Sequence, residues 1–431
     1  MGKEIEKLWK SEDYWAIWFA GALFIGIIIG AVSTVPKVGK WVAHPADAFA
    51  GDTGLWIAVL GIGLGVLMTV GLAVMRENWS KFFVGFLAVF VLAVIAYAVA
   101  GQTTVKAWGF GYAIWALFFG LLIANTVGTP DWILNGVKSE LFIKTGLVLL
   151  GGEILFSEIL KLGIPGLLVA WVVTPTVILF MWFFGTRWLK MASKSLTIII
   201  AAATSVCGVS AAIAVASACR AKKSELTLGV GMTMIFTVLM MIAMPPLSLA
   251  LGIPSAVAGG WLGGTIDSTG AVVAAGAFLG PTAEKVAAVV KMIQNVLIGV
   301  VAFLVALYWV TKVDRDPGAP RPSLMEIWYR FPKFILGFAA ASVIFSFVLM
   351  PALGHETVSS VLGVSKTFRG WFFCLAFVSI GLESNFKELA GQLVGGKPIY
   401  LYIVGQSFNL ILTLLMAWIA FGGILFSVFS E

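Results

Sequence analysis

"ATSVCGVSAA" (Ala203–Ala212) interrupts an apolar run that extends from Leu196 to Ala218. A regular membrane-spanning helix requires none of the Thr, Ser, Cys and Gly residues that this stretch places in the middle of the run. In hydrocarbon, backbone N–H and C=O groups without partners cost several kcal/mol each, so a chain break at that depth persists only where it lines a cavity or is buried in protein. The stretch therefore predicts an interrupted element enclosed by other helices.

Composition places the rest of the chain in a bilayer as well. Hydrophobic residues make up 60% of the sequence and charged residues 11%, whereas a soluble domain carries about 25% charged residues. Apolar runs recur along the whole chain, and each is long enough to cross about 30 Å of hydrocarbon. The sequence predicts an all-α polytopic membrane protein with about 11–13 transmembrane segments. The short alternating segments typical of a β-barrel do not occur.

The apolar segments and the polar connections between them give the expected organisation. The segments have the approximate bounds 14–33, 53–75, 82–101, 108–127, 141–160, 164–189, 196–219, 226–251, 254–280, 286–311, 331–350, 368–384 and 399–424. The longest polar connection follows residue 312 and marks a halfway point. We divide the chain into N-terminal accessory helices, a first repeat with a second interrupted element, a cytoplasmic linker and the C-terminal part of a second repeat, with bounds 1–101, 102–312, 313–330 and 331–431.

Two pairs of similar stretches indicate an internal repeat. "GGEILFSEIL" (151–160) and "GLESNFKELA" (381–390) share the pattern ExxFxE, and each ends an apolar run that is followed by a Gly and then a Pro. A weaker pair joins residues 204–218 to residues 265–278, where small polar residues around a Gly lead into an Ala- and Val-rich helix. Many transporters are built from inverted repeats of this kind. We therefore expect inverted structural repeats with two discontinuous or re-entrant elements.

The geometry of the two interrupted elements follows from the repeat. Inverted partners must run in opposite directions, and 196–219 and 254–280 satisfy this condition only if both are re-entrant hairpins. Cations flank the first element on both sides: Arg187, Lys190 and Lys194 precede it, and Arg220, Lys222 and Lys223 follow it. With a cytoplasmic N-terminus, the positive-inside rule favours hairpins. The alternative is a conventional broken helix that crosses the membrane.

Breaks of this kind are suited to binding an anion. The N-terminal amides of a helix carry roughly half a positive charge, so two broken helices hold an anion without any cationic side chain. The residues predicted to bind substrate are Thr204, Ser205, Cys207, Gly208, Val209, Ser210, Thr265, Ser268, Thr269, Gly270, Lys291 and Gln294. The alternative is that the small residues only allow helices to pack closely.

Charged residues at membrane depth point to a coupling ion. A buried charge there costs at least ~2.5–3.5 kcal/mol, so its presence predicts a function. Asp267 is the expected ligand of the coupling ion, with oxygens from Thr265, Ser268 and Asn295, or else it carries a proton. Lys291 is expected to counter an anion or to pair with Asp267. The alternatives are a water-exposed loop for Asp267 and a snorkelling side chain for Lys291.

Several other functions lack support in the sequence. The three cysteines lie in apolar runs and the two histidines are far apart, a pattern that implies neither a disulfide framework nor a metal site beyond Na⁺. We find no nucleophile–base pair in the apolar runs, so we expect neither an enzyme nor a cofactor. The net charge of +7 arises in short connecting loops, which is the membrane-topology pattern rather than a nucleic-acid surface.

Four motifs resemble a known family. "KTGLVLLG" (144–151), "SVCGVSAAIA" (205–214), "GGTIDSTGAVVAAG" (263–276) and "AEKVAAVVKMIQNV" (283–296) resemble the YeiH-type sulfate exporter family of bacterial membrane proteins. The resemblance implies a fold related to cation/proton antiporters and bile-acid-type sodium symporters, with a mobile core, a scaffold and elevator-like alternating access. It also implies a homodimer in the bacterial cytoplasmic membrane.

This chain departs from the family pattern at the proposed site. The family usually has His-Glu in place of Asp267-Ser268 and Arg in place of Gln294. These departures weaken the case for sulfate and strengthen the case for coupling to Na⁺.

Together the residues and the resemblance predict a secondary active transporter of a small anion, such as sulfate, a sulfonate or another small oxyanion. Transport is expected to be coupled to Na⁺ or H⁺. The first alternative is a cation/proton antiporter with no anion substrate, and the second is a channel or a membrane-embedded enzyme. We expect a multi-pass protein of the bacterial inner membrane with a cytoplasmic N-terminus.

Overall fold

Helices form every named secondary-structure element of the computed structural model, which describes residues 8–107, 111–154, 156–313, 323–387 and 396–426. Within these described residues, seven helical segments are long and apolar enough to span a bilayer: Thr53–Met75, Trp79–Gly101, Leu160–Trp188, Lys223–Ala250, Pro281–Val313, Phe334–Glu383 and Lys397–Phe421. Shorter apolar helices accompany them. The predicted all-α polytopic class is confirmed.

The helix boundaries agree with the two predicted interruptions and differ from the predicted segments in the last part of the chain. The runs 196–219 and 254–280 are each divided into two short helices. The predicted segments 331–350 and 368–384 lie within one continuous helical stretch, Phe334–Glu383. That stretch is kinked at Gly354, which has a φ of 80°. Hydropathy alone does not separate an interrupted helix from a continuous one, because it does not record where the backbone turns.

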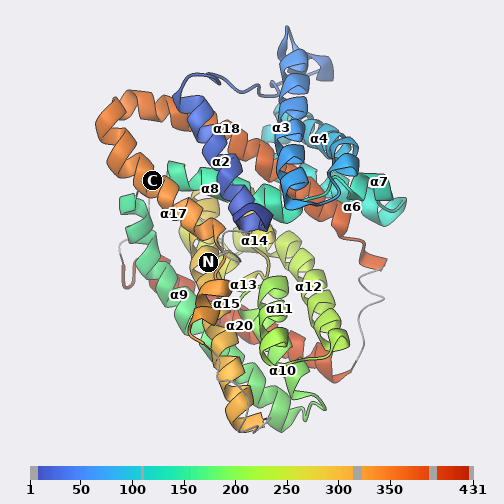
Figure 1. The fold of residues 1–431 in the computed structure, drawn as a ribbon, viewed down its shortest axis with the longest axis vertical. Helices are drawn as coiled ribbons and strands as arrows, with labels where there is room; N and C mark the ends of the chain where they lie inside the picture. Colours follow the sequence, from blue (N-terminus) through green and yellow to red (C-terminus); the bar gives the residue numbers. More distant parts are fainter. Residues whose placement is uncertain (1–7, 108–110, 155, 314–322, 388–395, 427–431) are drawn as a thin grey trace. The chain divides into compact units, whose positions relative to one another are not determined.

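The chain divides into two compact units that interleave along the sequence (Figure 1). The first unit comprises residues 1–158 and 333–385, and the second comprises residues 159–332 and 386–431. Each unit therefore contains residues from both halves of the chain, unlike the consecutive segments predicted from the sequence.

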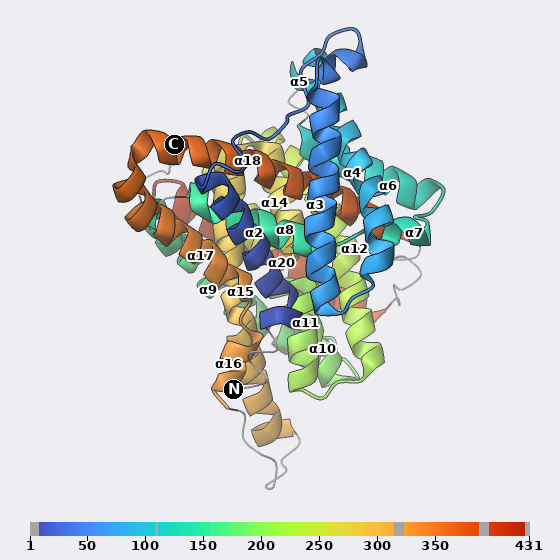
Figure 2. The same cartoon turned by 45° about the horizontal axis from the view of Figure 1, so that its top comes forward.

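The first unit contains the N-terminal helices and parts of both predicted repeats. Its elements are α2 (Glu12–Ile28), a 3₁₀ turn (Pro45–Phe49), α3 (Thr53–Met75), α4 (Trp79–Gly101), α5 (Thr103–Ala107), α6 (Tyr112–Thr126), α7 (Asp131–Leu134), α8 (Ser139–Glu153), α17 (Phe334–Ile344), a π-turn (Phe345–Leu349) and α18 (Met350–Glu383). The N-terminal helices are part of this packing. In Figure 2, α2 lies beside α8, and Lys144 Nζ of α8 is 3.1 Å from Asp13 Oδ1 of α2.

Helices α8 and α18 pack in opposite directions within this unit. Ser139 Oγ, at the start of α8, donates to Glu383 Oε2 at the end of α18 over 2.8 Å. At the end of α8, Glu153 Oε1 accepts from Arg369 Nε of α18, also over 2.8 Å. The two helices end in the two ExxFxE motifs, so their opposite directions agree with an inverted repeat. The last residue of the second motif, Glu388, lies outside the described residues.

Glycines at matching positions of the two motifs allow α8 to pack closely against α17 and α18 to pack closely against α6. A methyl group on Gly151 would lie 2.3 Å from the carbonyl oxygen of Phe338 in α17. A methyl group on Gly381 would lie 2.6 Å from the carbonyl oxygen of Leu117 in α6. Each motif therefore places a glycine against the first helix of the other repeat.

We expect Gly381→Ala to destabilise the protein by about 1–3 kcal/mol, because the added methyl group meets backbone atoms that cannot move aside cheaply. Thermal unfolding in detergent measures the effect. Gly363→Ala in the same helix is the control: a methyl group there has nothing within 4 Å. The control is expected to be neutral or slightly stabilising, since Ala is the better helix former. Equal melting temperatures for the two variants would contradict the packing argument.

The second unit contains both interrupted elements. Its helices are α9 (Phe156–Phe183), which begins at the boundary of the units, α10 (Lys194–Ser205), α11 (Gly208–Ala218), α12 (Lys223–Ala250), α13 (Ser255–Thr265), α14 (Thr269–Leu279), α15 (Pro281–Tyr308), α16 (Met325–Arg330) and α20 (Lys397–Phe421). Two π-turns, Phe184–Trp188 and Trp309–Val313, extend α9 and α15.

Helices α10 and α11 form a hairpin. Glu225, in the first turn of α12, accepts hydrogen bonds from Ser193 Oγ at 2.5 Å and Ser195 Oγ at 2.8 Å, at the start of α10. It also accepts from the backbone N–H of Lys222, just after α11, at 3.1 Å. The start of α10 and the end of α11 therefore lie together, and the turn between them, Val206–Cys207, forms the opposite end. We call this turn the first tip.

Helices α13 and α14 form a second hairpin against α15. Methyl groups on Gly259 and Gly263 would each lie 2.7 Å from a carbonyl oxygen of α15, those of Ala283 and Ala287 respectively, so α13 runs parallel to α15. Helix α14 leads directly into α15 through Gly280, which has a φ of 108°, and it returns antiparallel to α15. The turn Ile266–Ser268 between α13 and α14 is the second tip.

Within the second unit, the bases of the two hairpins lie at opposite ends of α12. This helix begins at the base of the first hairpin, passes the first tip at Thr233, where Gly208 lies against it, and ends four residues before α13. In Figure 1, α13 and α14 accordingly lie above α10 and α11. This arrangement is the hairpin geometry expected from the repeat, and it is not that of helices that continue through their breaks.

Candidate functional site at the hairpin tips

The two tips contact each other inside the second unit. The backbone N–H of Gly208 donates to the carbonyl oxygen of Asp267 over 2.7 Å. A methyl group on Gly208 would lie 2.4 Å from Thr233 Cγ2, so glycine allows the first tip to approach α12 closely. Residues that are 59 positions apart in the sequence thereby form one site.

Side chains from the surrounding helices bind the carbonyl ends of both hairpins. Gln294 Nε2 of α15 donates to the carbonyl oxygen of Ser205 at 2.9 Å and to that of Gly264 at 3.1 Å, which joins α10 to α13. Lys291 Nζ donates to the carbonyl oxygen of Val206 at 2.6 Å. The last carbonyls of a helix have no partner within it, so these contacts satisfy them without water.

Helices α9 and α20 add to this capping. Thr174 Oγ1 of α9 donates to the carbonyl oxygen of Ser205 over 3.0 Å. From α20, Gln406 Nε2 donates to the carbonyl oxygen of Thr265 over 3.1 Å, and Asn409 Nδ2 donates to that of Thr204 over 3.2 Å. The carbonyl ends of α10 and α13 are therefore bound from three helices.

The N-terminal ends of α11 and α14, by contrast, have no side-chain cap. Cys207 and Ser268 are the N-cap residues of α11 and α14, and neither side chain makes a capping hydrogen bond. The first hydrogen bonds to these caps come from Ala211 and Val272, one full turn into each helix. Gly208 N–H already donates to Asp267, so the remaining first-turn amides, among them those of Val209, Ser210, Thr269 and Gly270, are left for another acceptor. Helix N-termini favour negative charge.

Two charged side chains are buried at the tips. Asp267 and Lys291 are each 1% exposed. Asp267 Oδ2 accepts a hydrogen bond from Tyr402 Oη over 2.5 Å, and Lys291 Nζ donates to Gln294 Oε1 over 2.7 Å as well as to the first tip. Among the described residues, no ion pair joins Asp267 to Lys291. Burial of both side chains disagrees with the exposed-loop and snorkelling alternatives.

Several residues in or beside the second tip carry an oxygen atom without a partner. Four of the seven buried side-chain polar atoms that lack a hydrogen bond in the described structure are Thr265 Oγ1, Asp267 Oδ1, Asn295 Oδ1 and Gln406 Oε1. Buried polar groups in folded proteins are almost always paired. Four such atoms on residues in or bound to the second tip therefore require an explanation.

The other predicted residues take different positions. The hydroxyls of Thr204 and Ser205 donate to carbonyls of their own helix and are buried. Thr269 Oγ1 accepts from Asn295 Nδ2 over 3.0 Å. Cys207, Gly208 and Gly270 are buried, Ser268 is half-buried, and Val209 and Ser210 are exposed. The tips bring together most of the predicted set, while the side chains of Val209 and Ser210 lie on the exposed face of α11.

Sequence reasoning missed the contribution of α20. The predicted site contains none of Tyr402, Gln406 and Asn409, which contact the hairpins from this helix. Together with Thr413 they recur at spacings of three or four residues, which places them on one face of a helix. That spacing is a polar stripe in an otherwise apolar helix, and it was the available signal.

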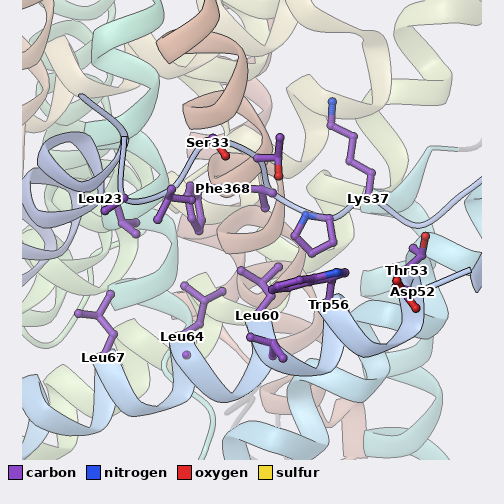
Figure 3. Close-up of a pocket in the computed structure, with 17 residues that line it drawn as sticks. Leu23, Ser33, Lys37, Asp52, Thr53, Trp56, Leu60, Leu64, Leu67 and Phe368 are labelled. Carbon is purple, nitrogen blue, oxygen red and sulfur yellow. The ribbon is translucent and has the colours of Figure 1, made fainter. Parts of the chain in front are cut away.

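A cavity of about 820 Å³ lies in the first unit (Figure 3). It is lined by the end of α2, residues 31–37, α3 and Phe368 of α18. Figure 3 shows Leu60, Leu64 and Leu67 along α3, with Lys37, Asp52 and Thr53 grouped toward one end. None of the residues predicted to bind substrate or ion lines this cavity.

Comparison with known proteins agrees with the resemblance seen in the motifs. A family model described as conserved hypothetical protein 698 matches residues 84–402. A UPF0324 membrane protein of Rhodopirellula baltica is 54% identical over 389 residues, which cover 89% of this chain and 71% of the relative. A UPF0324 membrane protein of Nitratidesulfovibrio vulgaris is 51% identical over 400 residues, which cover 89% of this chain and 69% of the relative.

A more distant relative carries the name used for the motif resemblance. The inner membrane protein YeiH of Escherichia coli is 26% identical over 322 residues, which cover 73% of this chain and 84% of the relative. No solved structure matches the chain. The family match and the apolar helices lead to one conclusion: the chain belongs to the conserved hypothetical protein 698 family and is a multi-pass membrane protein.

Proposed function

We propose that the protein is a secondary active transporter that binds a small anion between the two hairpin tips. The observation that carries the proposal is the difference between the helix ends. Carbonyl ends of α10 and α13 are bound by side chains, whereas the N-caps of α11 and α14 make no capping hydrogen bond. Amides at a helix N-terminus form an anion site, and two such ends meet here.

The opposed hairpins also suit alternating access. Their bases lie at opposite ends of α12, so each hairpin separates the tips from one side of the membrane. Transporters of this design bind substrate near the midplane, where half-helices meet. Because hydrogen bonds tie both tips to α9, α15 and α20, the second unit is suited to move as one body in an elevator-type cycle. We place the protein in the bacterial cytoplasmic membrane with its N-terminus in the cytoplasm.

A second candidate is a cation/proton antiporter without an anion substrate. The unpaired oxygens beside Asp267 favour a cation, and a carboxylate that exchanges Na⁺ for H⁺ would use them. Lys291 and the open amide ends argue for the anion transporter, because an antiporter of cations gains nothing from positive charge at the first tip.

Uptake by proteoliposomes distinguishes these functions. Purified protein is assayed with labelled sulfate, sulfite, methanesulfonate, acetate and bicarbonate, under an inward Na⁺ gradient or an inward H⁺ gradient. We expect saturable uptake of at least one anion that stops when the gradient is collapsed. Proton flux driven by Na⁺ without any anion would instead identify the antiporter, and conductance independent of substrate gradients would identify a channel.

A further inference from the structure

We infer that Asp267 binds one Na⁺ together with Thr265, Asn295 and Gln406, and that this ion makes the site selective for anions that carry a single negative charge. The inference rests on the proposed transport function and adds the ion, its ligands and the charge of the substrate.

The proposed Na⁺ ligands are the oxygen atoms that make no hydrogen bond. Asn295 Nδ2 donates to Thr269 Oγ1, and Gln406 Nε2 donates to the carbonyl oxygen of Thr265. With the nitrogens so fixed, each amide turns its oxygen to an unpaired position. Tyr402 Oη donates a hydrogen bond to Asp267 Oδ2, whereas Asp267 Oδ1 has no partner. Both amide nitrogens bind threonines within two residues of Asp267, so the two amide groups lie beside the second tip.

The chemistry of this set favours a monovalent metal ion. All four atoms are oxygens, which are the ligands that hard cations prefer. Only one of them belongs to a carboxylate, and the described residues contain no group of three or more His, Cys, Asp or Glu that could hold a metal. A divalent ion would therefore leave a buried positive charge. A proton on Asp267 Oδ1 would donate to at most one of the other oxygens and leave two unpaired.

Charge then links the ion to the anion. With Asp267 and Lys291 as the charged groups of the tips, the empty site has a net charge of zero. Na⁺ alone makes the site positive, and a monovalent anion alone makes it negative. A net charge inside a membrane protein is costly, so the two ligands should bind together. A divalent anion with one Na⁺ would leave a negative charge.

The positions of the two charges separate the two subsites. Lys291 binds the carbonyl oxygen of Val206 at the first tip, where α11 begins, and this positive end is suited to the anion. Asp267 lies in the second tip. The hydrogen bond from Gly208 to Asp267 joins the subsites. Glu284, the remaining buried charged residue of the described second unit, precedes Lys291 by about two turns of α15.

Paired flux measurements test the stoichiometry. Proteoliposomes are loaded with ²²Na⁺ and ¹⁴C-labelled acetate or methanesulfonate, with labelled sulfate as the divalent comparison. We expect Na⁺ and a monovalent anion to move in a ratio of one to one, without dependence on membrane potential. Uptake driven by a pH gradient and indifferent to Na⁺ overturns the inference but leaves the proposed function intact. Absence of anion transport with any gradient overturns both.

Variants test the ligands. Asn295→Ala and Gln406→Ala are expected to raise the Na⁺ concentration for half-maximal uptake about tenfold or more. Ser379→Ala is the control, because Ser379 also carries a buried oxygen without a partner but belongs to the first unit. Unchanged Na⁺ dependence in both amide variants overturns the assignment.

A variant that gains Na⁺ binding separates the two explanations for a loss of uptake, a lost ligand and a failure to fold. Gln406→Glu adds one negative charge, so Na⁺ then neutralises the site without an anion. The melting temperature of this variant in detergent should rise with Na⁺ alone, whereas the parent protein should require Na⁺ and a monovalent anion together. A parent protein that responds equally to the choline and the sodium salt of each anion overturns the inference.

Discussion

Replacing Asp267 with Asn is expected to abolish Na⁺-driven anion uptake, with a loss of about 100-fold or more in rate at limiting Na⁺. The substitution removes the negative charge but keeps the size of the side chain and an acceptor for Tyr402. Lys291 then makes the empty site positive, and Na⁺ would add a second positive charge in a medium where one already costs at least ~2.5–3.5 kcal/mol. Uptake under an inward Na⁺ gradient measures the loss.

The same variant should bind the anion without Na⁺, since the anion now neutralises Lys291 by itself. Titration of the anion as its choline salt, followed by melting temperature, measures this gain. Glu225→Gln is the control, because it removes a carboxylate from the base of the first hairpin. That control is expected to change stability but not the Na⁺ concentration for half-maximal uptake. Full Na⁺ dependence in the Asp267→Asn protein would remove the carboxylate from the ion site.

Local sequence was sufficient to locate the breaks. Gly208 and the polar residues around Asp267 interrupt apolar runs that are otherwise long enough to span a bilayer, and an interruption at that depth has few physical explanations. The opposite directions of the hairpins also followed from sequence, because repeats and cations together restrict the number of crossings. These features depend on residues that are close together in the chain.

Contacts between distant segments could not be predicted from local sequence patterns. Tyr402 and Gln406 reach the second tip from 135 and 141 residues away, and no local pattern states which side of α20 faces the hairpins. Two compact units that interleave are a further example, since α8 and α18 meet through residues more than 200 positions apart. The exposed side chains of Val209 and Ser210 show that a position next to a break does not determine which way a side chain points.

Replacing Lys291 with Met is expected to have the opposite effect on binding from Asp267→Asn: Na⁺ should bind without the anion, rather than the anion without Na⁺. Methionine is of similar length but carries no charge, so the empty site becomes negative and Na⁺ binds without an anion. Anion uptake should fall about 100-fold, because the anion would now leave a net negative charge even with Na⁺ bound. Equilibrium binding of ²²Na⁺ in the presence and absence of acetate or methanesulfonate measures the change. Lys222→Met, an exposed position before α12, is the control and should behave as the parent protein.

The free energies of unfolding of these variants test independently whether the charges of Asp267 and Lys291 interact. Lys291→Met leaves the carbonyl oxygen of Val206 and Gln294 Oε1 without their donor, at a cost of about 1–3 kcal/mol for each buried group. It also leaves Asp267 without a compensating charge. The double variant Asp267→Asn/Lys291→Met restores a neutral site, so its loss of stability should be smaller than the sum of the two single losses. Strictly additive losses would mean that the two charges do not interact, and coupling through net charge would then have no basis.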